Sequence, residues 1–100
     1  KIPSDAKRVI LKANGKSYLS DNCAKALADI GIITIGTDAL SVASYDNEYN
    51  IHTILLGKKI AILESLDLSN ANAGKYFLSA APLKIKGSDG AFVRAVLIKF

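Results

Sequence analysis

Two short apolar runs constrain the fold of this chain more than any other feature of its sequence. Residues 32–35 (IITI) lie between two glycines, and residues 60–63 (IAIL) follow a pair of lysines. A strand that is buried on both faces has this pattern, and such strands occur in parallel sheets covered by helices. The two runs therefore predict a parallel sheet whose strands are joined by helical crossovers.

Three further segments have the composition of strands. Residues 8–12 are apolar and β-branched and lead into the turn pair at 14–15. Residues 76–85 and 91–99 form two later candidate strands, joined by a glycine-containing turn at 87–90. Because this last connection is short, the two strands are predicted to be antiparallel.

Two helices are predicted between the first three strands. Ser20 is a candidate N-cap for the first helix, and Gly31 is its natural stop. After a polar loop at 44–50, residues 51–57 show one apolar face of a short second helix. The resulting order, β-α-β-α-β-β-β, predicts one α/β domain over residues 1–100 with a mixed sheet, parallel first and antiparallel at its end.

Composition limits the class of protein. Half of the 100 residues are hydrophobic and 22% are charged, which is typical of a compact globular domain. The apolar runs are far shorter than the roughly 18 residues of a membrane-spanning helix, so we expect no membrane association. The single cysteine, Cys23, is interpreted as a small buried helix residue and fits a reducing, cytoplasmic setting. The absence of methionine suggests that the chain begins partway through a longer protein.

The charge distribution argues against a nucleic-acid partner, although the net charge is +4. Basic residues are spaced through the first quarter and the last fifth of the chain, without the clustering typical of nucleic-acid binders. Between Asp29 and Asp67, acidic residues outnumber the two lysines, Lys58 and Lys59. This acidic middle is better suited to holding a cation.

The only histidine, His52, lies on the second predicted helix, and Glu64 directly follows the strand at 60–63. A helix followed by a strand packed beneath it can bring these two side chains together as ligands for zinc or manganese. From spacing alone, a lone histidine is more often a surface or hydrogen-bonded polar residue. Glu64 is the stronger signal, because an acid at the end of a buried strand needs a cation, a hydrogen-bond network or water as its partner.

Three segments together resemble the cyclase family of metal-dependent hydrolases, which includes bacterial kynurenine formamidase (arylformamidase). Residues 52–64 (HTILLGKKIAILE) are similar to its second metal-ligand segment, and residues 35–42 (IGTDALSV) to its Gly-Ile-Asp-x-x-Ser segment. Residues 81–95 (APLKIKGSDGAFVRA) resemble its closing Leu-Pro-Leu-Lys-x-x-Gly-x-Asp-Gly-x-Pro-Val-Arg-Ala signature. The resemblance covers essentially the whole chain in the family's order.

The resemblance implies a swivelling β/β/α-type fold, a zinc or manganese cofactor and hydrolysis of a small-molecule amide. Arylformamidases release formate from N-formyl-kynurenine in tryptophan breakdown. By the same resemblance, His52 and Glu64 fall on metal ligands, and Asp38 and Ser41 fall near the site. Either of these last two residues could support the ligands or cap a turn after the strand.

The departures from the family pattern define what this chain lacks. The motif His-x-Gly-Thr-His-x-Asp-x-Pro-x-His, which carries the other ligands and the catalytic histidine, is absent, because His52 is the only histidine. Ala43 and Phe92 also replace the usual acid and proline. We therefore expect a C-terminal portion that supplies half of a metal site and no catalytic residue.

The missing metal ligands have more than one possible source. The missing ligands would come from an N-terminal portion of the same protein or from a partner chain with the histidine-rich motif. The resemblance also implies self-association into homo-oligomers. The alternative function is a non-catalytic binding or assembly subunit that retains the fold.

Overall fold

A computed structural model of the chain describes residues 2, 5–14, 16–82 and 90–99. The chain divides into two compact units, Lys1–Ser69 and Asn70–Phe100. Within the described residues, no helix has both the length and the apolar character needed to cross a membrane. A single domain over residues 1–100 stays a prediction.

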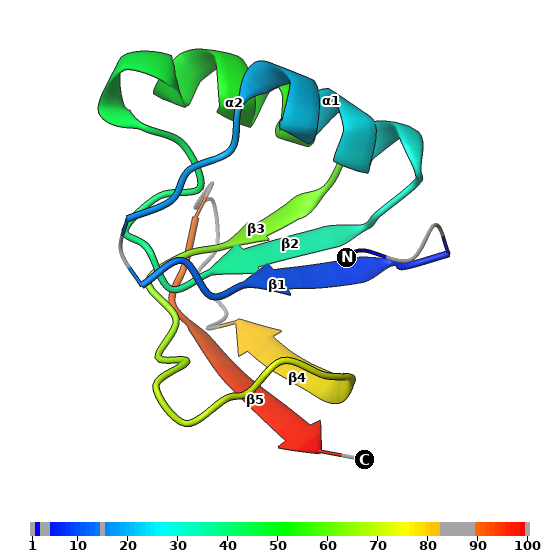
Figure 1. Ribbon diagram of the computed structural model, residues 1–100, viewed down its shortest axis with the longest axis vertical. Helices are drawn as coiled ribbons and strands as arrows, with labels where there is room; N and C mark the ends of the chain where they lie inside the picture. Colours follow the sequence, from blue (N-terminus) through cyan, green and yellow to red (C-terminus); the bar gives the residue numbers. More distant parts are fainter. Residues whose placement is uncertain (1, 3–4, 15, 83–89, 100) are drawn as a thin grey trace. The chain divides into compact units, whose positions relative to one another are not determined.

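The first unit contains the predicted parallel sheet (Figure 1). Its elements are β1 (Arg8–Leu11), α1 (Asp21–Asp29), β2 (Thr34–Thr37), the 3-10 turn η1 (Tyr45–Asn47), α2 (Glu48–Gly57) and β3 (Ala61–Leu63). The strands lie in the order β1-β2-β3, and Ile35 is opposite both Val9 and Ile62. Both helices cover the same face of this sheet. Right-handed crossovers produce this arrangement when each new parallel strand is added on the same side of the previous one.

The core of the first unit lies between this face and the helices. Ile35 of β2 is fully buried, and Ala24 and Leu27 form the buried side of α1. Ile51 and Leu55, four residues apart on α2, are also fully buried. The spacing of these residues at three or four positions is the helical periodicity that the sequence predicted.

Helix α1 begins and ends where the sequence predicts. The Ser20 hydroxyl accepts the Cys23 N–H at 3.1 Å, and Gly31 after the helix has φ +86°. Glycine adopts this left-handed conformation without steric cost, which explains the stop. The interpretation of Cys23 as buried is wrong, because the buried side of α1 contains Ala24 and Leu27 and leaves Cys23 exposed.

Helix α2 begins earlier than the sequence predicts. The polar segment 44–50 was predicted as a loop, but it contains the turn η1 and the start of α2 at Glu48. The Asn47 N–H donates to the Ser44 carbonyl at 3.0 Å and leads into the helix. This first part carries no apolar periodicity because it is solvent-exposed, with Tyr45 and Tyr49 at 94% and 81% exposure.

The ends of two flexible side chains approach the backbone of Gly36 in β2. A Cβ atom at this position would lie 2.6 Å from Cδ1 of Ile10 and 3.0 Å from Cδ1 of Leu66. The absence of a side chain at Gly36 therefore lets Ile10 of β1 and Leu66, which follows β3, pack against this strand.

The second unit is a two-stranded antiparallel sheet of β4 (Tyr76–Pro82) and β5 (Val93–Lys99). Phe77 pairs with Ile98 and Ser79 with Val96. The described strands thus form two sheets, and the prediction of one mixed sheet is wrong for this part of the chain, because β4 and β5 satisfy each other's backbone groups as a separate pair. The predicted continuation of the strand through 83–85 and most of the turn at 87–90 lie outside the described residues.

Candidate metal centre

The reversal of the chain after α2 brings His52 and Glu64 together. The Lys58 and Ile60 N–H groups both donate to the Leu55 carbonyl at 3.1 Å, which turns the chain from α2 into β3. Glu64 then follows the last residue of β3. Nε2 of His52 lies 3.1 Å from Oε2 of Glu64, and the two side chains are 26% and 30% exposed. The pair is thus half-buried and reachable from solvent.

A backbone carbonyl fixes the orientation of the His52 ring. Nδ1 lies 2.9 Å from the carbonyl oxygen of Glu48, one turn earlier on α2. A carbonyl oxygen only accepts hydrogen bonds, so Nδ1 must carry the proton and donate it. In the neutral ring, Nε2 is then left with a lone pair that points toward Glu64.

The carboxylate of Glu64 is held equally firmly. Its Oε2 accepts the Val42 N–H at 3.2 Å. The next residue, Ser65, has a left-handed φ of 58° and donates its N–H to the Ala39 carbonyl at 2.8 Å. The loop after β2 therefore anchors both the carboxylate and the backbone beside it. A non-glycine residue in this conformation is uncommon and persists where the surroundings fix it.

With a neutral ring these contacts place two electron-pair donors face to face, whereas a doubly protonated ring forms an ion pair with Glu64. A carboxylate oxygen and an unprotonated Nε2 at 3.1 Å repel each other unless a proton or a cation lies between them. Two ligands of a tetrahedral ion at roughly 2.0 to 2.1 Å lie about 3.3 Å apart, close to the separation of this pair. The donor types and their spacing therefore fit a divalent cation as two of its ligands.

Asp38 and Ser41 make contacts of a different kind. The Asp38 carboxylate accepts the N–H groups of Ala13 and Asn14, at 2.7 and 3.1 Å, and so joins the loops after β1 and β2. The Ser41 hydroxyl oxygen accepts the Ala43 N–H at 3.1 Å. Both side chains accept backbone N–H groups at the carboxyl ends of the strands, and their place near a metal site stays a prediction.

The partners that hold His52 and Glu64 were not predictable from residue types. Both are backbone groups, the Glu48 carbonyl and the Val42 N–H, and every residue except proline carries such groups. Within residues 2, 5–14, 16–82 and 90–99, no three His, Cys, Asp or Glu side chains gather closely enough to hold a metal ion. The roles of His52 and Glu64 as metal ligands stay a prediction.

Several known proteins are similar to this chain. A kynurenine formamidase of Salinibacter ruber is 51% identical over 73 residues, which cover 72% of this chain and 34% of that protein. Cyclase-like protein 1 of Oryza sativa is 35% identical over 102 aligned residues, covering 98% of this chain and 37% of the relative. No family model matches the chain.

A solved structure supports the same likeness. It is described as a potential metal-dependent hydrolase with cyclase activity, and it matches with a TM-score of 0.75 at 35% identity. The match covers 80% of this chain and 40% of that one. The mixed α/β fold with small sheets is therefore similar to that of one class of proteins, the metal-dependent hydrolases.

Within that class, the resemblance to the cyclase family, with kynurenine formamidases among the relatives, is confirmed. The chain spans about a third of the length of the curated relatives that it matches.

Proposed function

We propose that this chain supplies His52 and Glu64 as two ligands of a zinc or manganese site in an amide hydrolase. The observation that carries the proposal is the orientation of His52, whose Nδ1 donates to the Glu48 carbonyl while Nε2 faces Oε2 of Glu64. A metal-binding histidine commonly donates its other ring N–H to a carbonyl or carboxylate in this way. Glu64 is fixed in a similar manner by the Val42 N–H.

The proposed reaction is that of an arylformamidase, the conversion of N-formyl-kynurenine to kynurenine and formate. When bound, the metal ion supplies Lewis-acid polarisation of the amide carbonyl. The described residues of this chain orient the two ligands, and proton transfer is assigned to a histidine of another segment. This division of roles is supported by the similarity to kynurenine formamidases and metal-dependent hydrolases.

The proposal requires a second polypeptide segment. Catalytic zinc sites use three protein ligands and an open position, one ligand more than His52 and Glu64 provide. The other ligands and a proton-transferring histidine would come from an N-terminal portion or a partner chain with the histidine-rich motif. The complete protein would have a swivelling β/β/α-type fold, self-associate into homo-oligomers and work in the cytoplasm.

The test is an assembled activity. The chain is mixed or co-expressed with the histidine-rich portion of a similar kynurenine formamidase, and hydrolysis of an aryl formamide is followed with added zinc or manganese. We expect no turnover by either part alone and turnover by the assembly. Replacing Glu64 by Gln should abolish the assembled activity, whereas Asp29→Asn, at the exposed end of α1, should retain it. Turnover by this chain alone would refute the division of roles.

A second candidate function is a non-catalytic binding or assembly subunit. The observation that favours it is the exposed apolar surface of the second unit, where Phe77, Phe92 and Ile98 are 58%, 81% and 52% exposed. Large exposed apolar side chains in one small unit are typical of interaction surfaces. If His52→Ala and Glu64→Ala change neither the metal content nor the activity of the assembly, this second function is the better one.

A further inference from the structure

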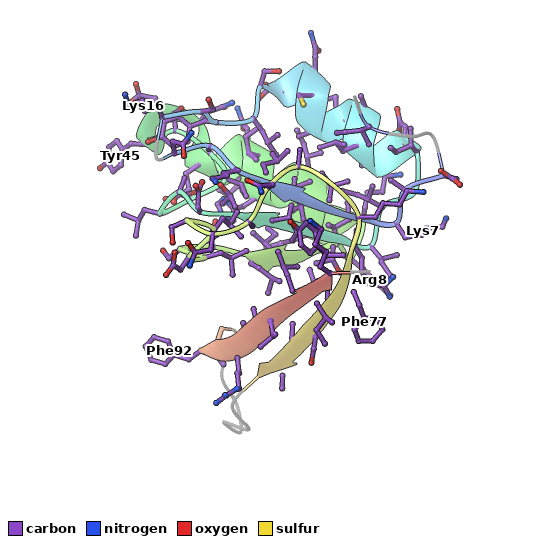
Figure 2. All side chains as sticks on the ribbon, turned by 60° about the horizontal axis from the view of Figure 1, so that its bottom comes forward. Lys7, Arg8, Lys16, Tyr45, Phe77 and Phe92 are labelled. Atoms are coloured by element: carbon purple, nitrogen blue, oxygen red, sulfur yellow. The ribbon has the colours of Figure 1, made fainter. Side chains whose placement is uncertain are left out.

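A cavity of about 200 Å³ lies at the carboxyl end of the parallel sheet. Leu11 and Thr37, which end the strands β1 and β2, line it together with residues of the two following loops. In Figure 2, Lys7 and Arg8 mark the opposite, amino end of β1. Ligands of open α/β sheets bind outside the carboxyl ends of the strands, which is where this cavity opens.

The lining of the cavity is mostly apolar. Leu11, Leu19 and Val42 provide aliphatic walls, and the ring of Tyr18, which is 51% exposed, lies at the solvent side. Thr37 is 2% exposed, and its hydroxyl oxygen already accepts the Ala39 N–H at 3.0 Å. Small-molecule sites have this composition, with apolar walls and few polar groups.

The size of the cavity selects among apolar occupants. An engineered apolar cavity of about 150 Å³ binds benzene. A volume of about 200 Å³ therefore fits one six-membered ring with a small substituent. Lys12 and Ser17 complete the lining, so a cationic occupant would lie beside a residue of like charge.

Hydrogen bonds between loops hold the walls of the cavity in place. The Leu19 N–H donates to the Val42 carbonyl at 2.9 Å and ties two walls together. Asp38 accepts the N–H groups of Ala13 and Asn14 and fixes the loop after β1, where Ala13 is also part of the lining. A site that is formed before binding loses less conformational entropy when the ligand enters.

We propose that this cavity binds an apolar, ring-sized group of a small molecule, and that the first unit does so without a metal ion. The inference goes beyond the proposed metal site, since neither His52 nor Glu64 lines the cavity. The two features are nevertheless neighbours, because Val42 lines the cavity and donates its N–H to Glu64. In a complete enzyme, a ring held here would lie on the substrate side of Glu64.

The test is a titration of the isotopically labelled 100-residue chain with benzamide, followed by amide NMR shifts in metal-free buffer. A neutral ligand of this size is expected to bind with a dissociation constant on the order of 1 mM. The largest shifts should occur at Ala13, Leu19 and Val42. Hexanamide, which has a flexible chain in place of the ring, should bind more weakly.

Two tyrosines give a matched pair of variants. Tyr18→Ala removes a wall and should weaken benzamide binding about tenfold, whereas Tyr18→Phe should retain it. Tyr45→Ala is the control, because Tyr45 is 94% exposed, is not part of the lining and projects into solvent (Figure 2). Equal effects of Tyr18→Ala and Tyr45→Ala would overturn the proposal, as would the absence of saturable shifts up to the solubility limit.

A further variant separates this inference from the metal site. His52→Ala should leave benzamide binding unchanged while it removes a metal ligand, because the hydrogen-bond partners of His52, Glu48 and Glu64, do not line the cavity. Loss of benzamide binding in this variant, with the fold retained by circular dichroism, would contradict a metal-independent cavity. Failure of metal binding with benzamide binding intact would contradict only the proposed function.

Discussion

The two units of the chain differ in how much apolar surface they bury. Every buried hydrophobic residue among those described lies between Val9 and Leu68, in the first unit. In the second unit, the paired residues Phe77 and Ile98 remain 58% and 52% exposed. An isolated two-stranded hairpin is marginally stable in water, whereas a sheet covered by two helices encloses a core. The comparison indicates that the first unit provides most of the stability of this chain.

The largest expected difference between the units comes from truncating a matched pair of isoleucines. Ile35 is fully buried at the centre of the parallel sheet, and Ile98 is half exposed on β5. Ile35→Ala should lower the free energy of unfolding by about 2 to 5 kcal/mol, because it removes buried methyl groups and leaves a cavity. Ile98→Ala should lower it by less than about 1 kcal/mol. Urea unfolding followed by circular dichroism measures both values.

Equal losses for the two variants would contradict the comparison. They would mean that the hairpin face carrying Ile98 contributes as much to the stability of the chain as the enclosed core does. An Ile35→Val variant, which removes one methyl group, serves as a milder check and should cost about 0.5 to 1.5 kcal/mol.

An intermediate effect is expected when a methyl group is added to a glycine. In the first unit, a Cβ at position 36 would overlap the ends of the Ile10 and Leu66 side chains, at 2.6 and 3.0 Å. Gly36→Ala should therefore lower the free energy of unfolding by about 1 kcal/mol, because both flexible ends can move to make room. At Gly90, in the second unit, no atom of the described residues beyond its chain neighbours lies within 4 Å of such a Cβ, and Gly90→Ala should change stability by less than about 0.5 kcal/mol. A neutral Gly36→Ala would show that the first unit is less tightly packed than described.

The smallest effect concerns the pH dependence at the end of the first unit. The Ser69 hydroxyl and N–H donate to Oδ1 of Asp67, at 2.7 and 3.1 Å, and lower the pKa of that carboxyl below its ordinary 3.8. The contacts therefore stabilise the fold above that pH, and the contribution is lost as the pH falls through the lowered pKa. Ser69→Ala should raise the pKa of Asp67, measured by carboxyl NMR titration. Ser79→Ala, in the second unit, should leave that pKa unchanged.

The sequence predicted the order of the helices and strands because the buried elements have clear local signals. Ser20 and Gly31 marked the limits of α1, and the apolar runs marked β2 and β3. The start of α2 was missed because its first turn is exposed and carries no apolar periodicity. The division into two sheets was missed because strand composition does not state which strands pair.

The candidate site was predictable only in part. The chain reversal between α2 and β3 made it reasonable to expect His52 near Glu64, and the structure brings them to 3.1 Å. The backbone groups that orient them have no signature in the sequence, and the turn-fixing contacts of Asp38 and Ser41 depend on how the loops after β1 and β2 meet. The cavity also escaped prediction, because its walls come from four separate segments.

His52 and Glu64 are proposed to bind one cation together, and titration calorimetry with Zn²⁺ measures that binding. We expect weak binding to the chain that His52→Ala and Glu64→Gln each weaken by at least about tenfold, while Asp29→Asn, at the exposed end of α1, has no effect. Zinc affinity that is equal in the original chain and in all three variants would contradict the proposal.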